Sequence, residues 1–214
     1  GRRAVSARLD LVVVGAGFGG LACAESAARR GARVVVVERR RAPGEAVGTT
    51  GLLTREAAEA LRPPPSVLGA RIDAIELGLG ARSGVLRREG AGFLATDTGA
   101  LLRSLAERAA GAGAALRFGA RAELADAHRG VVRADGELLR ADRVIAADGA
   151  RSQVAQRAGI ARPARFLRGA ERHVELEQGH GLDAGACLLA LDPRLAPGYA
   201  AWCVRGGHAW QVGV

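Results

Sequence analysis

A glycine-rich turn followed by one acidic residue is the first part of this 214-residue sequence with the residue types and spacing of a binding site. Residues 15–20 read GAGFGG, which contains the pattern GxGxxG, and Glu38 follows about twenty residues later. In such a turn the backbone approaches a pyrophosphate closely, and N–H groups at the start of the next helix bind its oxygens. A carboxylate at Glu38 accepts hydrogen bonds from ribose hydroxyls and repels a 2′-phosphate, so NADP is disfavoured while NAD and FAD remain. The predicted cofactor-binding residues of this segment are Gly15, Gly17, Phe18, Gly19, Gly20, Glu38 and its neighbour Arg39.

The chain around this turn has the pattern of a β-α-β unit. Leu9–Val14 is a continuous apolar run, which is typical of a strand buried on both faces of a parallel sheet. Residues 21–30 have a helical composition and end before Gly31, and residues 32–37 are expected to form a second buried strand. This context makes the glycine pattern specific, because GxGxxG alone is a weak signal. The alternative for Glu38 is a solvated charge at a strand end.

A second motif separates the two remaining cofactors. An apolar run ends in Asp148-Gly149, and Ser152 then suits the N-cap of a helix. In this order the two motifs resemble the fingerprints of the flavoprotein monooxygenase and reductase superfamily. The resemblance implies that Asp148 and Gly149 lie near the pyrophosphate and ribose of FAD, on the side where NAD(P)H could approach as electron donor. The alternative is a plain turn with a helix cap.

The fold class that follows is α/β, with a Rossmann-like FAD-binding domain built on a parallel sheet with a β-meander. A helix is expected from Asp97, with short strands at 114–118, 121–125, 131–134, 137–140 and 143–147. Residues 1–162 would form this domain, with an inserted β-hairpin around 70–90. Residues 163–214, with strands near 165–177 and 186–191, would begin a mostly antiparallel substrate domain that is incomplete at its C-terminal end.

Two further segments resemble the geranylgeranyl reductase-like branch of that superfamily. Pro43-Gly44 is followed by GTTGL at residues 48–52, with Thr54 as a helix cap, and Gly48 stands where the branch has Cys. Residues 196–204, APGYAAWCV, resemble a segment that walls the substrate pocket; the alternative is that its aromatic residues pack a sheet core. The resemblance implies a substrate pocket formed by Gly48, Thr49, Thr50, Gly51, Tyr199 and Trp202.

Composition excludes several other classes. The net charge is +9, but arginines are spread along the whole chain and aromatic residues make up only 3%, so a nucleic-acid partner is not expected. No apolar run reaches the about 18 residues of a membrane span, although peripheral membrane contact stays open. Three cysteines without short spacing indicate neither disulfides nor zinc, and His173 and His180 are expected at the surface, so no metal is predicted. A cytoplasmic protein is therefore expected.

The predicted function is that of an FAD-dependent oxidoreductase. The resemblance implies that reduced flavin reduces a carbon–carbon double bond of an isoprenoid or similar small apolar substrate. An FAD-dependent monooxygenase is the alternative, because Gly48 replaces the cysteine. No catalytic residue is nominated. The sequence has no Met and lacks the family's third fingerprint, so a fragment of a longer flavoprotein is expected, and an inert fragment is the second alternative.

Overall fold

The computed structural model describes residues 8–45, 47–80, 82–87, 92–161, 163–175, 181–206 and 209–214. Its contacts divide the chain into two compact units. Unit 1 consists of Gly1–Glu45 and Leu102–Ala164, and unit 2 consists of Ala46–Leu101 and Arg165–Val214. None of the helices described is long and apolar enough to span a membrane.

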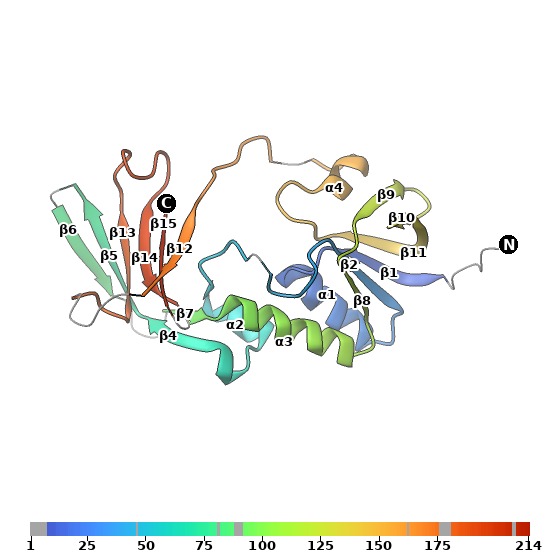
Figure 1. The fold of residues 1–214 in the computed structure, drawn as a ribbon, viewed down its shortest axis with the longest axis horizontal. Coiled ribbons are helices and arrows are strands. Elements are labelled where there is room, and N and C mark those ends of the chain that lie inside the picture. Colours follow the sequence, from blue (N-terminus) through green and yellow to red (C-terminus); the bar gives the residue numbers. More distant parts are fainter. Residues whose placement is uncertain are drawn as a thin grey trace. The chain divides into compact units, whose positions relative to one another are not determined.

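Unit 1 is built on a six-stranded sheet with the order β8-β2-β1-β11-β10-β9 (Figure 1). β1, β2, β8 and the second half of β11 run parallel, whereas β9, β10 and the first half of β11 form an antiparallel meander. This arrangement confirms the Rossmann-like sheet with its β-meander. The strands are β1 (Leu9–Val14), β2 (Val34–Glu38), β8 (Ala115–Phe118), β9 (Ala122–Asp126), β10 (Val131–Ala134) and β11 (Glu137–Ala146).

Both faces of this sheet are covered, which is why its central strands are continuous apolar runs. Val12 and Val14 of β1 pack into a cluster with residues of the meander and of α4 (Gln153–Arg157). Two longer helices, α1 (Phe18–Ala28) and α3 (Thr98–Gly111), are linked by an ion pair in which Arg108 binds the buried Glu25. The helix predicted from Asp97 is confirmed, since the Asp97 carboxylate accepts the N–H of Ala100 at 2.8 Å.

Unit 2 contains a six-stranded sheet with the order β12-β15-β14-β13-β5-β6 and a three-stranded sheet with the order β3-β7-β4. Every strand pair in the larger sheet is antiparallel except β13 with β5. Ile72, Cys187 and Val204 form a core between the two sheets. The elements are β3 (Leu52–Leu53), α2 (Arg55–Leu61), η1 (Pro65–Val67), β4 (Leu68–Ile72), β5 (Ala74–Leu79), β6 (Arg82–Arg87), β7 (Phe93–Thr96), β12 (Glu171–Val174), β13 (Ala186–Ala190), β14 (Ala201–Arg205) and β15 (Trp210–Gly213).

The structure differs from the expected elements at several places. The hairpin expected around 70–90 is β5–β6, and because β5 pairs with β13, residues 46–101 belong with the C-terminal segment rather than with residues 1–45. The strands expected at 137–140 and 143–147 are one strand, β11, which pairs with β10 and then with β1. Of the strands expected near 165–177, β12 is present, while His180 lies outside the described residues.

Candidate functional site

The predicted cofactor residues gather at one edge of the unit 1 sheet. β2, β1 and β11 are parallel neighbours, with Val14 of β1 in register with Val37 and Ala146. Parallel strands end on the same side of a sheet, and ligands of open α/β sheets bind outside those ends. The glycine turn after β1, Glu38 at the end of β2 and Asp148-Gly149 after β11 therefore lie along a single edge.

The glycine turn is built for close packing at two positions and for open space at two others. A Cβ on Gly15, whose φ is +105°, would lie 2.1 Å from the Ala147 carbonyl oxygen, and one on Gly20 would lie 2.0 Å from the Gly15 oxygen. A Cβ on Gly17 or Gly19 would have no neighbouring heavy atom within 4 Å. Gly17 is also the N-cap of α1 and provides no side-chain cap. The turn thus presents backbone N–H groups beside open space, which fits a pyrophosphate.

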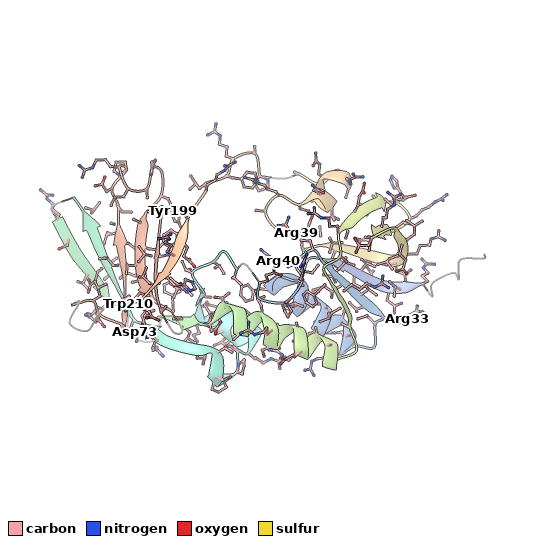
Figure 2. All side chains as sticks on the ribbon, viewed as in Figure 1. Arg33, Arg39, Arg40, Asp73, Tyr199 and Trp210 are labelled. Carbon is pink, nitrogen blue, oxygen red and sulfur yellow. The ribbon has the colours of Figure 1, made fainter. Side chains whose placement is uncertain are left out.

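Glu38 connects the glycine turn to the end of β2. Its side chain is buried, and its two carboxylate oxygens accept the N–H of Ala16 and the N–H of Arg40, each at 2.8 Å. A carboxylate has about four lone-pair positions, so a ribose hydroxyl can still donate to it. Figure 2 shows Arg39 and Arg40 where β2 ends and Arg33 at its opposite end. Sequence reasoning placed Glu38 correctly at the strand end but missed its bonds to the backbone.

Asp148 forms bonds mainly with its own segment. One carboxylate oxygen accepts the Ser152 hydroxyl, and the other accepts the N–H groups of Gln153 at 2.8 Å and Val154 at 3.2 Å. Ser152 in turn accepts the N–H of Ala155 at 2.9 Å, so both side chains cap α4. Gly149 has a φ of +93° and open space where a side chain would lie. Asp148 therefore shapes the turn, and the Gly149 backbone is the group left to face a ligand.

The turn at Gly48–Gly51 is anchored at its end and open at its start. The Gly51 carbonyl accepts both the hydroxyl of Thr96 at 2.8 Å and its backbone N–H at 2.9 Å. A Cβ on Gly51 would lie 2.2 Å from the Thr98 hydroxyl oxygen, whereas one on Gly48 would meet no heavy atom within 4 Å. Thr96 was missed by sequence reasoning, although a polar residue ending an apolar strand was a signal for it.

The predicted aromatic wall lies in the same unit. Tyr199 and Trp202 form an edge-to-face pair with ring centroids 6.2 Å apart and planes at 88°. Gly213 makes room for the indole, because a Cβ there would lie 2.1 Å from Cζ2 of Trp202. Leu52, which follows the Gly48–Gly51 turn, and Trp202 pack against the same core cluster. The two predicted pocket segments are therefore attached to one core of unit 2.

Comparisons with known proteins agree with this geometry. The family model of the pyridine nucleotide-disulphide oxidoreductases matches residues 9–181. A digeranylgeranylglycerophospholipid reductase of Methanothrix thermoacetophila is 31% identical over 97% of this chain and 56% of its own length. A geranylgeranyl bacteriochlorophyll reductase-like structure from Thermoplasma acidophilum superposes with a TM-score of 0.78 at 23% identity, over 97% of this chain and 56% of that one.

A hydroxylase shares the same fold. The ternary complex of aklavinone-11 hydroxylase with FAD and aklavinone has a TM-score of 0.67 at 24% identity, over 96% of this chain and 45% of that one. The chain thus spans about half the length of the relatives it matches. The resemblance to geranylgeranyl reductase-like flavoproteins is confirmed.

Proposed function

The chain belongs to the pyridine nucleotide-disulphide oxidoreductase family, and from this premise we propose that it binds FAD and reduces carbon–carbon double bonds of an isoprenoid or similar apolar substrate. One observation carries the proposal. The ends of β1, β2 and β11 bring the open glycine turn, Glu38 and the Gly149 turn to one edge, which is the arrangement that an adenine dinucleotide needs.

Each of these groups has a separate task in binding. The uncapped N–H groups at the start of α1 bind the pyrophosphate, and the partial positive charge of the helix favours it there. Glu38 accepts the hydroxyls of the adenosine ribose while its bonds to Ala16 and Arg40 hold it in place. The Gly149 backbone approaches the cofactor from the neighbouring strand end. When bound, FAD supplies hydride transfer, and NAD(P)H is the proposed electron donor.

The substrate assignment rests on the relatives and on unit 2. The name of the Methanothrix relative describes a reductase of a lipid that carries geranylgeranyl chains. The Tyr199–Trp202 pair and the turn at Gly48–Gly51 offer aromatic and backbone surface of the kind that binds apolar ligands. Gly48 has no side chain that could donate a proton to the substrate. We therefore assign the Gly48–Gly51 turn to shaping the substrate pocket.

Reconstitution with FAD followed by a single-turnover assay tests the proposal. The purified chain is expected to retain flavin absorbance in the visible after gel filtration. Anaerobic reduction and addition of a prenyl substrate should restore the oxidised flavin spectrum and yield a product heavier by two hydrogens. An oxygen-dependent hydroxylated product would instead establish the monooxygenase, which the structural likeness to aklavinone-11 hydroxylase makes the rival. Absence of flavin after gel filtration would support the inert fragment.

The variant Gly17→Ala provides a matched control for the binding step. The added methyl group meets no protein atom within 4 Å, so the fold is expected to persist. The same methyl group occupies the space assigned to the pyrophosphate. Flavin retention should therefore be lost in this variant while its thermal unfolding stays that of the unsubstituted protein.

A further inference from the structure

Two neighbouring surface loops of unit 2 expose large apolar side chains. The exposed fractions are 42% for Phe166, 65% for Leu167, 57% for Leu195 and 63% for Tyr199. A Cβ on Gly198 would lie 3.8 Å from Cδ2 of Leu167, so the two loops are adjacent. We call residues 165–168 and 194–199 the apolar loop pair. Soluble proteins rarely leave apolar side chains gathered in this way unless the surface has a partner.

Backbone hydrogen bonds fix the end of the first loop and the turns of the second. Ala170 exchanges two backbone hydrogen bonds with Val214, at 2.9 and 3.0 Å, immediately after the first loop. At the second loop the N–H of Leu195 donates to the Asp192 carbonyl at 3.0 Å, and the N–H of Tyr199 donates to the Ala196 carbonyl at 3.1 Å. The Tyr199 ring then forms the edge-to-face pair with Trp202. These contacts connect the segments that expose the apolar side chains to the rest of unit 2.

The charge of this surface favours an anionic partner. Arg165 and Arg168 flank the two apolar residues of the first loop, are exposed, and have no carboxylate partner among the described residues. Arg194, in the second loop, is also exposed. Its guanidinium forms an ion pair with the Asp192 carboxylate at 2.7 Å, so its charge is neutralised. A second copy of the chain docked through the same surface would bring these arginines together, and like charges repel. An anionic lipid bilayer offers headgroup phosphates for the arginines and an acyl-chain region for the apolar side chains.

We propose that the apolar loop pair docks the protein on an anionic lipid bilayer. The loop backbones limit how deeply the loops can insert into the bilayer, because N–H and C=O groups without hydrogen-bond partners do not enter hydrocarbon. Leu167 and Leu195 then enter the boundary between headgroups and acyl chains, with Tyr199 at the headgroup level where tyrosine is enriched. Arg165 and Arg168 contact the lipid phosphates.

This inference rests on the proposed function in one respect. A prenyl substrate dissolved in a bilayer can reach an enzyme only at the membrane surface. The loop pair includes Tyr199, whose ring pairs with that of Trp202, and we assign both aromatic residues to the substrate pocket. Docking there places the pocket wall beside the lipid that contains the substrate.

Vesicle sedimentation of the reconstituted full chain tests the proposal. The protein should pellet with phosphatidylglycerol vesicles and remain in solution with phosphatidylcholine vesicles. Arg165→Gln with Arg168→Gln should lower the partition constant about thirtyfold, the factor that two basic side chains contribute near an anionic surface. Leu167→Ser with Leu195→Ser should abolish binding.

The β5–β6 hairpin supplies matched control variants in the same unit. Arg82→Gln with Arg87→Gln removes two positive charges, as the arginine variant of the loop pair does. Leu79→Ser with Leu86→Ser removes two leucines whose exposed fractions are 52% and 63%. Both controls should bind vesicles as the unsubstituted protein does. Equal losses in the controls, or no binding by the unsubstituted protein, would overturn the proposal.

Two further readouts separate the remaining outcomes. Sedimentation equilibrium showing a dimer that Leu167→Ser with Leu195→Ser dissociates would assign the surface to a second copy and refute lipid docking. Flavin absorbance of the same samples reports the proposed function independently. Flavin retained without vesicle binding would overturn the docking alone, whereas vesicle binding without flavin would overturn FAD binding alone.

Discussion

Replacing Glu38 tests two roles that the structure gives to one carboxylate. Its oxygens accept the N–H groups of Ala16 and Arg40 in a buried position, and its free lone pairs are assigned to a ribose. Glu38→Ala removes both internal hydrogen bonds and leaves the N–H groups of Ala16 and Arg40 without this acceptor. Glu38→Gln retains one acceptor oxygen but turns its amide group toward the second N–H, so it also leaves one donor without a partner.

The magnitudes of the two effects differ. Hydrogen bonds to a charged group contribute about 1.5–3 kcal/mol each, so losing the two bonds in Glu38→Ala should lower the free energy of unfolding by about 3–6 kcal/mol without any cofactor. For a chain of this size that loss corresponds to a fall of about 6–24 °C in Tm. Loss of the ribose contact should separately weaken FAD binding by about 1–3 kcal/mol, which is roughly 5- to 150-fold in affinity. The free energy of unfolding of Glu38→Gln should lie between those of the unsubstituted protein and Glu38→Ala.

Circular dichroism melting without FAD and fluorescence titration with FAD measure the two effects separately. Glu45→Ala is the control, since Glu45 also accepts two backbone N–H groups, those of Arg41 at 2.9 Å and Ala42 at 3.3 Å, but is exposed. It should change Tm little and FAD affinity not at all. An unchanged Tm for Glu38→Ala would refute the role of the internal bonds. An unchanged FAD affinity would refute the ribose assignment.

Three further predictions follow from the glycines and from the partly buried ion pair of Glu25 and Arg108. Gly20→Ala should prevent correct folding of unit 1, because its methyl group would lie 2.0 Å from a backbone oxygen. Circular dichroism compares this variant with Gly17→Ala, which is expected to fold. Gly48→Cys should fold normally, since its Cβ meets no atom within 4 Å, and an altered rate of substrate-dependent flavin reoxidation would show that position 48 faces the reaction. Burial opposes the charge of Glu25, but hydrogen bonds from Arg108 and Arg29 lower the pKa of this carboxyl below its usual value. The stabilisation is therefore present above the unfolded pKa and lost as pH falls through the folded pKa, so Glu25→Gln should cost about 2 kcal/mol in urea unfolding at pH 7 and progressively less in acid.

Sequence patterns predicted the parts of the site whose causes are local. The turn at Gly15–Gly20 and the position of Glu38 follow from a strand-turn-helix-strand pattern of fewer than forty residues. Ser152 as a cap of α4 is equally local. These features depend on backbone geometry that neighbouring residues determine, and the structure places them as expected.

Long-range pairing could not be predicted in the same way. The assignment of residues 46–101 to unit 2 depends on β5 pairing with β13, more than a hundred residues along the chain. The anchoring of Gly51 by Thr96 likewise joins segments 45 residues apart. Apolar alternation indicates a strand with one buried face, but it does not say which other strand pairs with it.

The two carboxylates at the proposed cofactor edge explain how the site is prepared before any ligand binds. Glu38 uses both oxygens on backbone N–H groups, and Asp148 uses both on the start of α4. None of these hydrogen bonds requires FAD, so the turns after β1 and β11 are held by the chain's own interactions. The groups left for the pyrophosphate are then backbone N–H groups next to Gly17 and Gly149, where no side chain intervenes. Because the ordering of both turns is already completed by folding, FAD binding should lose little free energy to rearrangement of the protein.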